Sequence, residues 1–327
     1  MQNIEYQVTT MAGSAEKSIE GFTDGLAEKA RFNRPNGLAI GKQGSIFAAD
    51  FGNHAIRRIS QIGEVTTIAG GRAGKLIDGP ATLATFNNPR GLTFDSSGNL
   101  YVADFGNSRI RKISPELVVS SLAGTGTRGT SDGRALEAMF DELRDVTYHS
   151  GYIFAADRYR VRRVSLFGQV TTWAGGLESG LWDGQGVAAR FGTLSAIAAD
   201  LPGNIFVVDV DNVAIRYITP LQKVGTLAGA DVIPPEGSNT FLQNPVGLAV
   251  DRDGNCWVTD LGDYTIKKIT PKGVITQVAG SLVAGCQDGS ALQASFQHPS
   301  GIAVADDGRI YVTDIERHTV RCIYPKQ

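Results

Sequence analysis

Histidine and cysteine are scarce in this chain of 327 residues, which carries four histidines and three cysteines. A catalytic zinc ion takes three protein ligands, and neither the histidines nor Cys256, Cys286 and Cys322 are spaced like a metal-binding or redox motif. The chain also lacks His-Glu-x-x-His, a nucleophile elbow and a glycine-rich phosphate loop. We therefore expect no cofactor, no metal ion and no catalytic residue, and the cysteine usage suits a reducing compartment.

The chain has almost no net charge and no long apolar segment. Its 31 basic and 33 acidic residues give a formal charge of −2, so the composition does not favour nucleic acid as a partner. No apolar run approaches the roughly 20 residues that span a membrane, and residues 1–6 have no signal-peptide pattern. We expect no membrane insertion and a cytoplasmic location, although a fragment of a larger secreted protein would look the same.

Glycine, by contrast, is abundant, and the 40 glycines punctuate a repeat. The segment Val102-Ala103-Asp104-Phe105-Gly106-Asn107 is followed by a strand-like segment, and the pair occurs six times. The copies are centred on Asp50, Asp104, Asp157, Asp209, Asp260 and Asp314, with spacings of 51 to 54 residues. Each copy consists of four short apolar or alternating segments between turns. A repeat of this length and composition predicts the blades of a β-propeller.

The two ends of the chain complete one another. The sixth copy stops after its third strand at Arg321 to Tyr324, and the missing fourth-strand sequence, Val8-Thr9-Thr10-Met11-Ala12-Gly13, lies at the other end. Pairing the ends would close the ring and remove its open edges. We predict an all-β, six-bladed β-propeller of four-stranded antiparallel blades, a single domain over residues 1–327, closed by residues 7–13 on the C-terminal blade.

The repeat resembles a known family. Its Pro-x-Gly start, its apolar strand ending in Asp, its Gly-Asn hairpin and its Ile-Arg-x-Ile strand are similar to the NHL repeat, in the long variety with an Asp-Gly insertion. The resemblance covers essentially the whole chain. Related propellers include protein binders, RNA binders and metal-dependent lyases and hydrolases, so the fold alone assigns no function. Calcium-dependent members use Glu, Asn and Asp on the axis, where this chain has mostly Ala, Ser or aliphatic residues.

Residues that recur in every copy are interpreted as scaffold. A basic residue in the third strand is expected to pair with the Asp that ends the second strand. The basic residues are Arg57, Arg111, Arg162, Arg216, Lys267 and Arg321. Recurrent phenylalanines are expected in the core between blades. They are Phe32, Phe86, Phe140, Phe191, Phe241 and Phe296.

Five copies also carry an Asp-Gly insertion before the phenylalanine. An Ala-rich stretch follows it, and we expect the Asp to cap a single helical turn there. A ring of calcium ligands is disfavoured, because loops of five different blades would have to converge on one ion. The fifth copy has Pro234 and Pro235 in the segment before its phenylalanine and is predicted to lack the helical turn.

The middle residue of the Pro-x-Gly turn varies from copy to copy, as expected of a site rather than a scaffold. Because the first strand of a blade lines the axis, these residues are predicted to surround one mouth of the channel. They are Asn36, Arg90, Arg144, Ser195, Val246 and Ser300, and His298 enters the same turn. Arg90 and Arg144 could hold an anion or an acidic side chain through their planar guanidinium groups. The alternative is that Arg144 pairs with Asp145 or Glu142, and Arg90 with another acidic neighbour.

A second group of candidates lies away from the channel mouth. The hairpin of the third copy is two residues shorter than its counterparts and carries Arg158 and Tyr159, and Trp182 stands beside Asp183. Tyrosine, tryptophan and arginine are common interface anchors. These three residues are interpreted as a possible interface, and the alternative is burial or a snorkelling side chain.

Together these observations favour a non-enzymatic recognition scaffold. It would bind a protein, a peptide or a small anionic ligand on the propeller face or at the channel mouth, through Asn36, Arg90, Arg144, Ser195, Ser300 and His298. The scaffold would be a monomeric propeller or a part of a larger multidomain protein. The alternative is a metal-dependent lyase or hydrolase with its site in the central channel.

Overall fold

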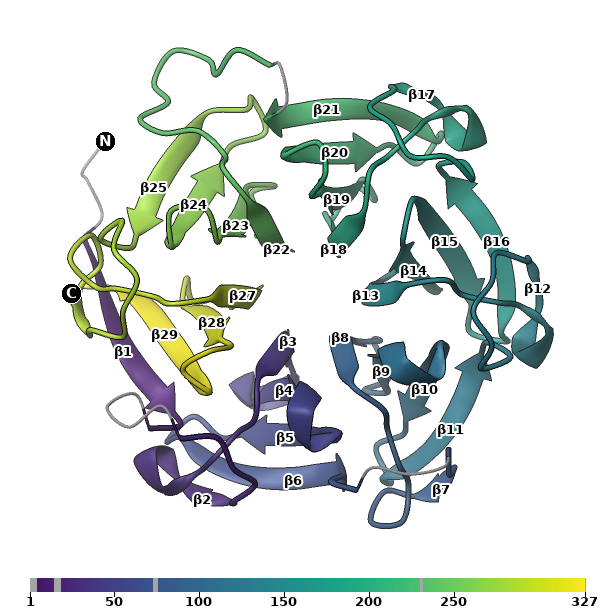
Figure 1. The fold of residues 1–327 in the computed structure, drawn as a ribbon, viewed down its shortest axis with the longest axis horizontal. Coiled ribbons are helices and arrows are strands. Elements are labelled where there is room, and N and C mark those ends of the chain that lie inside the picture. Colours follow the sequence, from purple (N-terminus) through teal and green to yellow (C-terminus); the bar gives the residue numbers. More distant parts are fainter. Residues whose placement is uncertain (1–4, 15–18, 73–75, 230–231, 327) are drawn as a thin grey trace.

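The computed structural model describes residues 5–14, 19–72, 76–229 and 232–326. Its described part forms six antiparallel sheets around a central axis, with the strands of each sheet stacked outward from that axis (Figure 1). The innermost strands are β3 (Pro35–Ile40), β8 (Pro89–Phe94), β13 (Leu143–His149), β18 (Leu194–Ala199), β22 (Pro245–Val250) and β27 (Pro299–Val304). The six-bladed all-β fold is thus confirmed.

The second strands are buried on both faces, as their continuous apolar character predicts. They are β4 (Ile46–Asp50), β9 (Leu100–Asp104), β14 (Tyr152–Asp157), β19 (Ile205–Asp209), β23 (Cys256–Asp260) and β28 (Ile310–Asp314). The third strands are β5 (Ala55–Ile59), β10 (Arg109–Ile113), β15 (Arg160–Ser165), β20 (Ala214–Ile218), β24 (Thr265–Ile269) and β29 (Thr319–Pro325). A buried apolar cluster lies at each junction between neighbouring blades, and together these six clusters make up the core.

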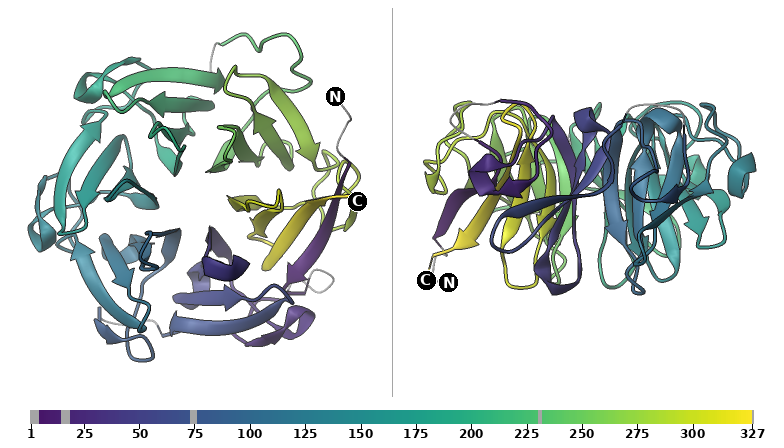
Figure 2. Two further views of the ribbon diagram at one scale, coloured as in Figure 1. Left: turned by 180° about the vertical axis from the view of Figure 1, so that it is seen from behind. Right: turned by 90° about the horizontal axis from the view of Figure 1, so that it is seen from below.

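The fourth strand of the sixth blade comes from the beginning of the chain. The other fourth strands are β6 (Glu64–Gly70), β11 (Val118–Ala123), β16 (Gln169–Ala174), β21 (Lys223–Gly229) and β25 (Ile275–Ala279). In the sixth blade β1 (Tyr6–Ala12) takes this place and pairs antiparallel with β29, from Tyr6 opposite Pro325 to Ala12 opposite Val320. The purple strand accordingly lies beside the yellow one in Figures 1 and 2.

The Asp-Gly insertions add a short fifth strand to the outside of five blades. These strands are β2 (Gly25–Leu26), β7 (Gly79–Pro80), β12 (Gly133–Arg134), β17 (Gly184–Gln185) and β26 (Gly289–Ser290). Single 3-10 turns follow three of them or stand in the hairpins. They are η1 (Ala27–Lys29), η2 (Lys42–Gly44), η3 (Phe51–Asn53), η4 (Phe105–Asn107), η5 (Ala135–Glu137) and η6 (Gly186–Ala188). The blade that contains Pro234 and Pro235 has no such strand among the residues described.

A buried cation joins the second strand to the insertion in the first four blades. In the sixth blade Arg321 instead pairs with the insertion Asp288 and donates to the backbone carbonyls of Ser295 and Gln287. In the first blade Arg57 donates to Asp50 at 2.6 Å and to the insertion residue Asp24 at 2.8 Å, and its guanidinium carbon lies 5.0 Å from the Phe32 ring centre. Asp50 also accepts the backbone N–H of Asn33, in the turn that leads to β3. A guanidinium group presents several N–H donors in a fixed plane, so it can hold both carboxylates at once.

The insertion Asp therefore does not act as predicted. No side-chain cap bond closes η1, η5 or η6. Instead Asp24 accepts from Arg57 and from the backbone N–H of Thr67 on β6. The helix-capping prediction is wrong because a buried cation offers this carboxylate a stronger, charge-assisted partner.

The fifth blade replaces this network with a rearranged one. Lys267 contacts Asp260 at 2.8 Å and Asp263 of its own hairpin at 2.6 Å. Asn239 takes the place of the insertion Asp and accepts the N–H of Gln277 on β25. The first, second and fourth blades have Asn53, Asn107 and Asn212 in the hairpin and Asp in the insertion, so compared with them the two residue types have changed places. The blade keeps one buried cation and two carboxylates.

The fifth blade also departs from the expected aromatic core. Five of the six predicted phenylalanines are fully buried, but Phe241 is 60% exposed. Leu242 is buried in its place, against β21 and β22 of the blades on either side. The prediction for Phe241 is wrong because the apolar contact has moved by one residue along the insertion.

Asp104 and Asp78, the two carboxylates around Arg111, provide a matched test of the network. The side chain of Asp104 is fully buried and that of Asp78 is 44% exposed. We expect Asp104→Ala to lower the free energy of unfolding by about 3–5 kcal/mol, because it leaves the buried charge of Arg111 without its inner partner. Asp78→Ala should lower it by about 1 kcal/mol, because water can replace the exposed carboxylate. Urea denaturation measures both. Equal losses would contradict a dominant role for the inner pair.

Removal of residues 1–13 tests the contribution of β1. Without it the long strand β29 loses its partner, and Val8 and Ala12, both fully buried, leave the core. We expect the truncated chain to melt well below the parent, because an apolar strand edge becomes exposed. Differential scanning calorimetry at matched concentrations measures the change. An unchanged melting temperature would show that the other blades do not need this strand.

Candidate functional site

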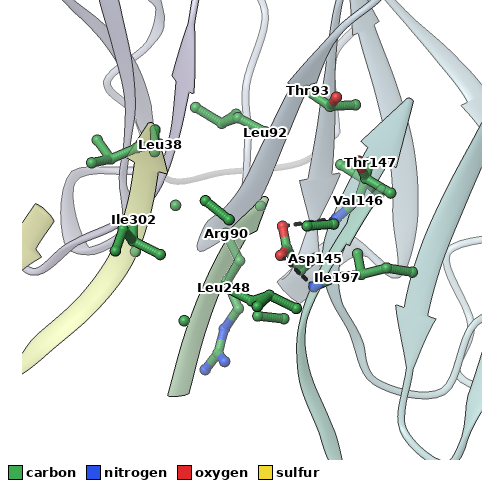
Figure 3. Close-up of a pocket in the computed structure, with 18 of the residues that line it drawn as sticks. Leu38, Arg90, Leu92, Thr93, Asp145, Val146, Thr147, Ile197, Leu248 and Ile302 are labelled. Carbon is green, nitrogen blue, oxygen red and sulfur yellow. Dashed lines mark hydrogen bonds between the residues drawn. The ribbon is translucent and has the colours of Figure 1, made fainter. Parts of the chain in front are cut away.

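The inner ends of the blades surround a cavity of about 290 Å³ on the axis. All six middle residues of the Pro-x-Gly turns and their equivalents line it. They are Asn36, Arg90, Arg144, Ser195, Val246 and Ser300. Figure 3 shows part of this wall, with Arg90 and Asp145 among aliphatic side chains. His298 is not among the lining residues, so the turn does not bring it to the cavity as expected.

The first strands approach one another so closely that most blades need glycine after the variable residue. A Cβ atom on Gly37 would lie 2.3 Å from the Arg90 carbonyl oxygen, and one on Gly301 would lie 2.0 Å from the carbonyl oxygen of Asn36. Such distances are far inside van der Waals contact. The glycine at this position is therefore set by the packing of neighbouring blades at the axis.

Asp145 stands where four blades have this glycine, and sequence reasoning did not single it out. Its carboxylate accepts the backbone N–H of Val146 at 2.8 Å and that of Ile197, on the next blade, at 2.9 Å (Figure 3). Gly91 of the preceding blade leaves room for it, since a Cβ there would lie 1.9 Å from Asp145 Oδ1. Burial raises the pKa of Asp145 to about 7. Comparing the glycine position across the six copies would have revealed it.

Arg144 is paired within the chain. Its Nη2 lies 2.8 Å from Glu142 Oε2, and both side chains are about three-quarters buried. The alternative of an internal pair is therefore confirmed for Arg144, with Glu142 as the partner. Asp145 is directed to the backbone of the third and fourth blades instead.

Arg90 has a different environment. No described carboxylate forms an ion pair or hydrogen bond with it, so the expected acidic partner is not found, and its buried Nε has no hydrogen-bond partner. Its guanidinium carbon instead lies 4.3 Å from the ring centre of Phe105 and 5.3 Å from that of Phe51, which belongs to the neighbouring blade. Burial, and then repulsion from Arg144, lower the pKa of Arg90 to about 10. It stays cationic at neutral pH.

Two histidines connect adjacent blades beside the mouth. His54 Nδ1 accepts the backbone N–H of Asn88 at 3.0 Å, and His318 Nδ1 accepts that of Arg34 at 3.1 Å. Burial lowers the pKa of His318, which favours the neutral ring that this bond requires. Each of these bonds fixes a turn residue of the following blade.

The other candidate group is divided. Arg158 Nη1 lies 2.7 Å from Asp141 Oδ2, and the Arg158 guanidinium carbon lies 4.6 Å from the centre of the Tyr159 ring. Arg158 of the short hairpin therefore has partners within the chain. Trp182 is 71% exposed on the fourth insertion, with exposed Leu177 and Leu181 in the same insertion. Burial is therefore ruled out for Trp182.

Among the described residues there is no group of three or more His, Cys, Asp or Glu side chains placed to hold a metal ion. None of the described helices has both the length and the apolar character to cross a bilayer.

The environment of Asp145 predicts a pH effect on stability. Since its pKa is higher in the folded chain than in the unfolded chain, the folded chain binds the proton more tightly, and this contribution to stability is lost as pH rises toward 7 and beyond. Between pH 5 and pH 8 we expect the wild-type free energy of unfolding to fall by about 2 kcal/mol more than that of Asp145→Asn, because the variant has no carboxyl group to titrate. Denaturation at both pH values, with exposed Asp306→Asn as control, measures the change. A difference that stays constant with pH would refute the assignment.

The chain has relatives of known sequence and structure. The NHL repeat model matches residues 32–59, 86–113 and 296–323. Protein SUPPRESSOR OF QUENCHING 1, chloroplastic, from Arabidopsis thaliana is 31% identical over 75% of this chain and 26% of its own length. NHL repeat-containing protein 2 from Gallus gallus is 27% identical over 88% of this chain and 46% of its own length. The chain thus spans between a quarter and half of these two relatives.

Two solved structures share the fold. A protein of unknown function from Bacteroides thetaiotaomicron superimposes with a TM-score of 0.75 at 18% identity, over 98% of this chain and 76% of that one. A gluconolactonase from Xanthomonas campestris gives a TM-score of 0.65 at 11% identity, over 98% and 90% of the two chains. The three matched repeats, the six blades and the similarity to an NHL repeat-containing protein show that this chain belongs to the NHL-repeat propeller family.

Proposed function

We propose that this chain is a recognition module, without catalytic activity, that binds an anionic group at the channel mouth. The group would belong to a protein, a peptide or a small molecule. The observation that carries the proposal is the unpaired Arg90 guanidinium beside a second arginine. Since the chain spans only part of its relatives, we place this module within a larger protein.

The charges around Arg90 leave one cation without a partner. Arg34 and Arg144 both lie close enough to lower the pKa of Arg90. Arg34 has Glu316 at 3.0 Å and Arg144 has Glu142 at 2.8 Å. Of these three arginines, Arg90 is the one without a carboxylate partner among the described residues, and an anion from outside would offset its repulsion from Arg144.

The two aromatic contacts hold Arg90 in position for such an anion. Phe51 and Phe105 come from equivalent hairpins of adjacent blades, so the guanidinium group is anchored at a junction rather than on a free loop. A side chain that is already ordered loses little entropy on binding. Cation–π contacts also leave the N–H groups available for an acceptor, unlike an ion pair.

Substitution of the two arginines tests the proposal. We expect Arg90→Ser to weaken binding of a Glu-rich peptide by about 1–3 kcal/mol. Arg144→Ser should have a smaller effect, because Glu142 already competes for that side chain. Fluorescence anisotropy with the labelled peptide at low and high salt measures both, since charge-dependent binding weakens with ionic strength.

The controls separate the site from general electrostatics. Arg309→Ser removes an exposed arginine that is paired with Asp307 in the hairpin between β27 and β28, and it should leave binding unchanged. The matched Gln-rich peptide should not bind. Equal binding by wild type and Arg90→Ser would refute the proposed function.

A further inference from the structure

We infer that the axial cavity takes a small monocarboxylic acid, with its carboxylate on Arg90 and an apolar chain directed along the channel. This inference rests on the proposed function and specifies its ligand. A free organic acid and the C-terminus of a partner chain with an apolar last residue share this chemistry.

The contacts of Arg90 favour a carboxylate. The ring contacts to Phe51 and Phe105 hold the guanidinium group, and its Nη atoms have no acceptor among the described residues. Two parallel N–H···O bonds from one guanidinium group match the two coplanar oxygens of a carboxylate.

The charges of the cavity favour a single negative charge on the ligand. Arg144 is neutralised by Glu142, so Arg90 is the one lining cation without an acidic partner in the described structure. Asp145 lines the same cavity and has no cationic partner. In Figure 3 the Asp145 carboxylate and the Arg90 guanidinium point in different directions. Above its pKa of about 7 Asp145 is a carboxylate, so at pH 8 a second anionic group on the ligand would be repelled there.

Beyond the mouth the wall is aliphatic. Each blade contributes one residue, two positions after the variable one, and the six residues form what we term the aliphatic ring. The ring consists of Leu38, Leu92, Val146, Ile197, Leu248 and Ile302, and all of them line the cavity. Each also belongs to the buried cluster at a blade junction, so the ring is held rigidly. An apolar chain would be desolvated there without losing a hydrogen bond.

The size of the cavity limits the ligand further. Its 290 Å³ is slightly below the roughly 300–1,000 Å³ of pockets for drug-sized molecules. A drug-sized acid therefore does not fit, and a small acid with a short apolar chain does.

A series of straight-chain acids tests the inference by isothermal titration calorimetry on the purified chain. The probes are acetate, butanoate and hexanoate, with hexan-1-ol, inorganic phosphate and hexanedioate for comparison. We expect affinity to rise about fourfold for each added methylene group. Hexan-1-ol should bind far more weakly than hexanoate, and Arg90→Ser should abolish that difference. Hexanedioate should bind more weakly than hexanoate, and Asp145→Asn should narrow the gap.

The outcomes distinguish this inference from the function on which it rests. If acetate, phosphate and hexanoate bind equally well and all depend on Arg90, the anion site stands and the apolar chain is refuted. If the acids do not bind but the Glu-rich peptide does, through Arg90, the small-acid ligand is again refuted. If neither binds, both proposals fail.

Two further probes separate the sources of the acid. A hexapeptide that ends in leucine is compared with the same peptide amidated at its C-terminus. Tighter binding of the free-acid peptide than of hexanoate assigns the site to a protein terminus, and the reverse order assigns it to a free organic acid. Equal binding of the free and amidated peptides, with no binding of hexanoate, would overturn the inference.

Discussion

The fold depends on a positive charge kept out of water. In each blade a fully buried Arg or Lys of the third strand forms an ion pair with at least one carboxylate. The Asp that ends the second strand is a partner in the first five blades, and the insertion Asp is a partner in every blade except the fifth. Burying such a charge is costly unless it is paired and hydrogen-bonded. The Nη atoms of the buried arginines make these bonds, as in Arg57, whereas their Nε atoms have no partner among the described residues. The network therefore ties the outer strand, the insertion and the turn at the channel mouth into one unit per blade.

That unit determines where variation is possible. The strand-two carboxylates hold the backbone N–H groups of the mouth turns, as Asp104 holds Asn87. The strand-two carboxylates thus fix the backbone of the turns at the channel mouth, and the side chains of these turns are free to differ between blades. Arg90 and Asp145 occupy positions of this kind, and neither belongs to the repeating network. A rigid scaffold with variable side chains at one end is a suitable arrangement for recognition.

The fold could be predicted because the repeat supplies six independent copies of one pattern. The strands, five of the six predicted pairs between a third-strand cation and the strand-two Asp, and the ring of residues around the mouth follow from position in that pattern. The exception is Arg321, which pairs with Asp288 of the insertion. The errors lie where an insertion changes the local geometry, as when Leu242 replaces Phe241 in the core. Pairing across blades could not be predicted either. That Arg90 meets two aromatic rings instead of a carboxylate depends on side-chain directions in two neighbouring hairpins, and the repeat does not encode these.

The pairing of β1 with β29 affects the order in which the chain can fold. Those strands are separated by about three hundred residues, so their contact carries a large loop-closure cost and cannot form until the last blade has left the ribosome. The first five blades consist of nearly local hairpins and can form earlier. During synthesis β1 would remain unpaired, and residues that are buried in the folded chain, such as Val8, would be exposed to solvent. We therefore expect joining of the ends to be the slow step of folding, and the stage at which the chain is most prone to associate with another copy of itself.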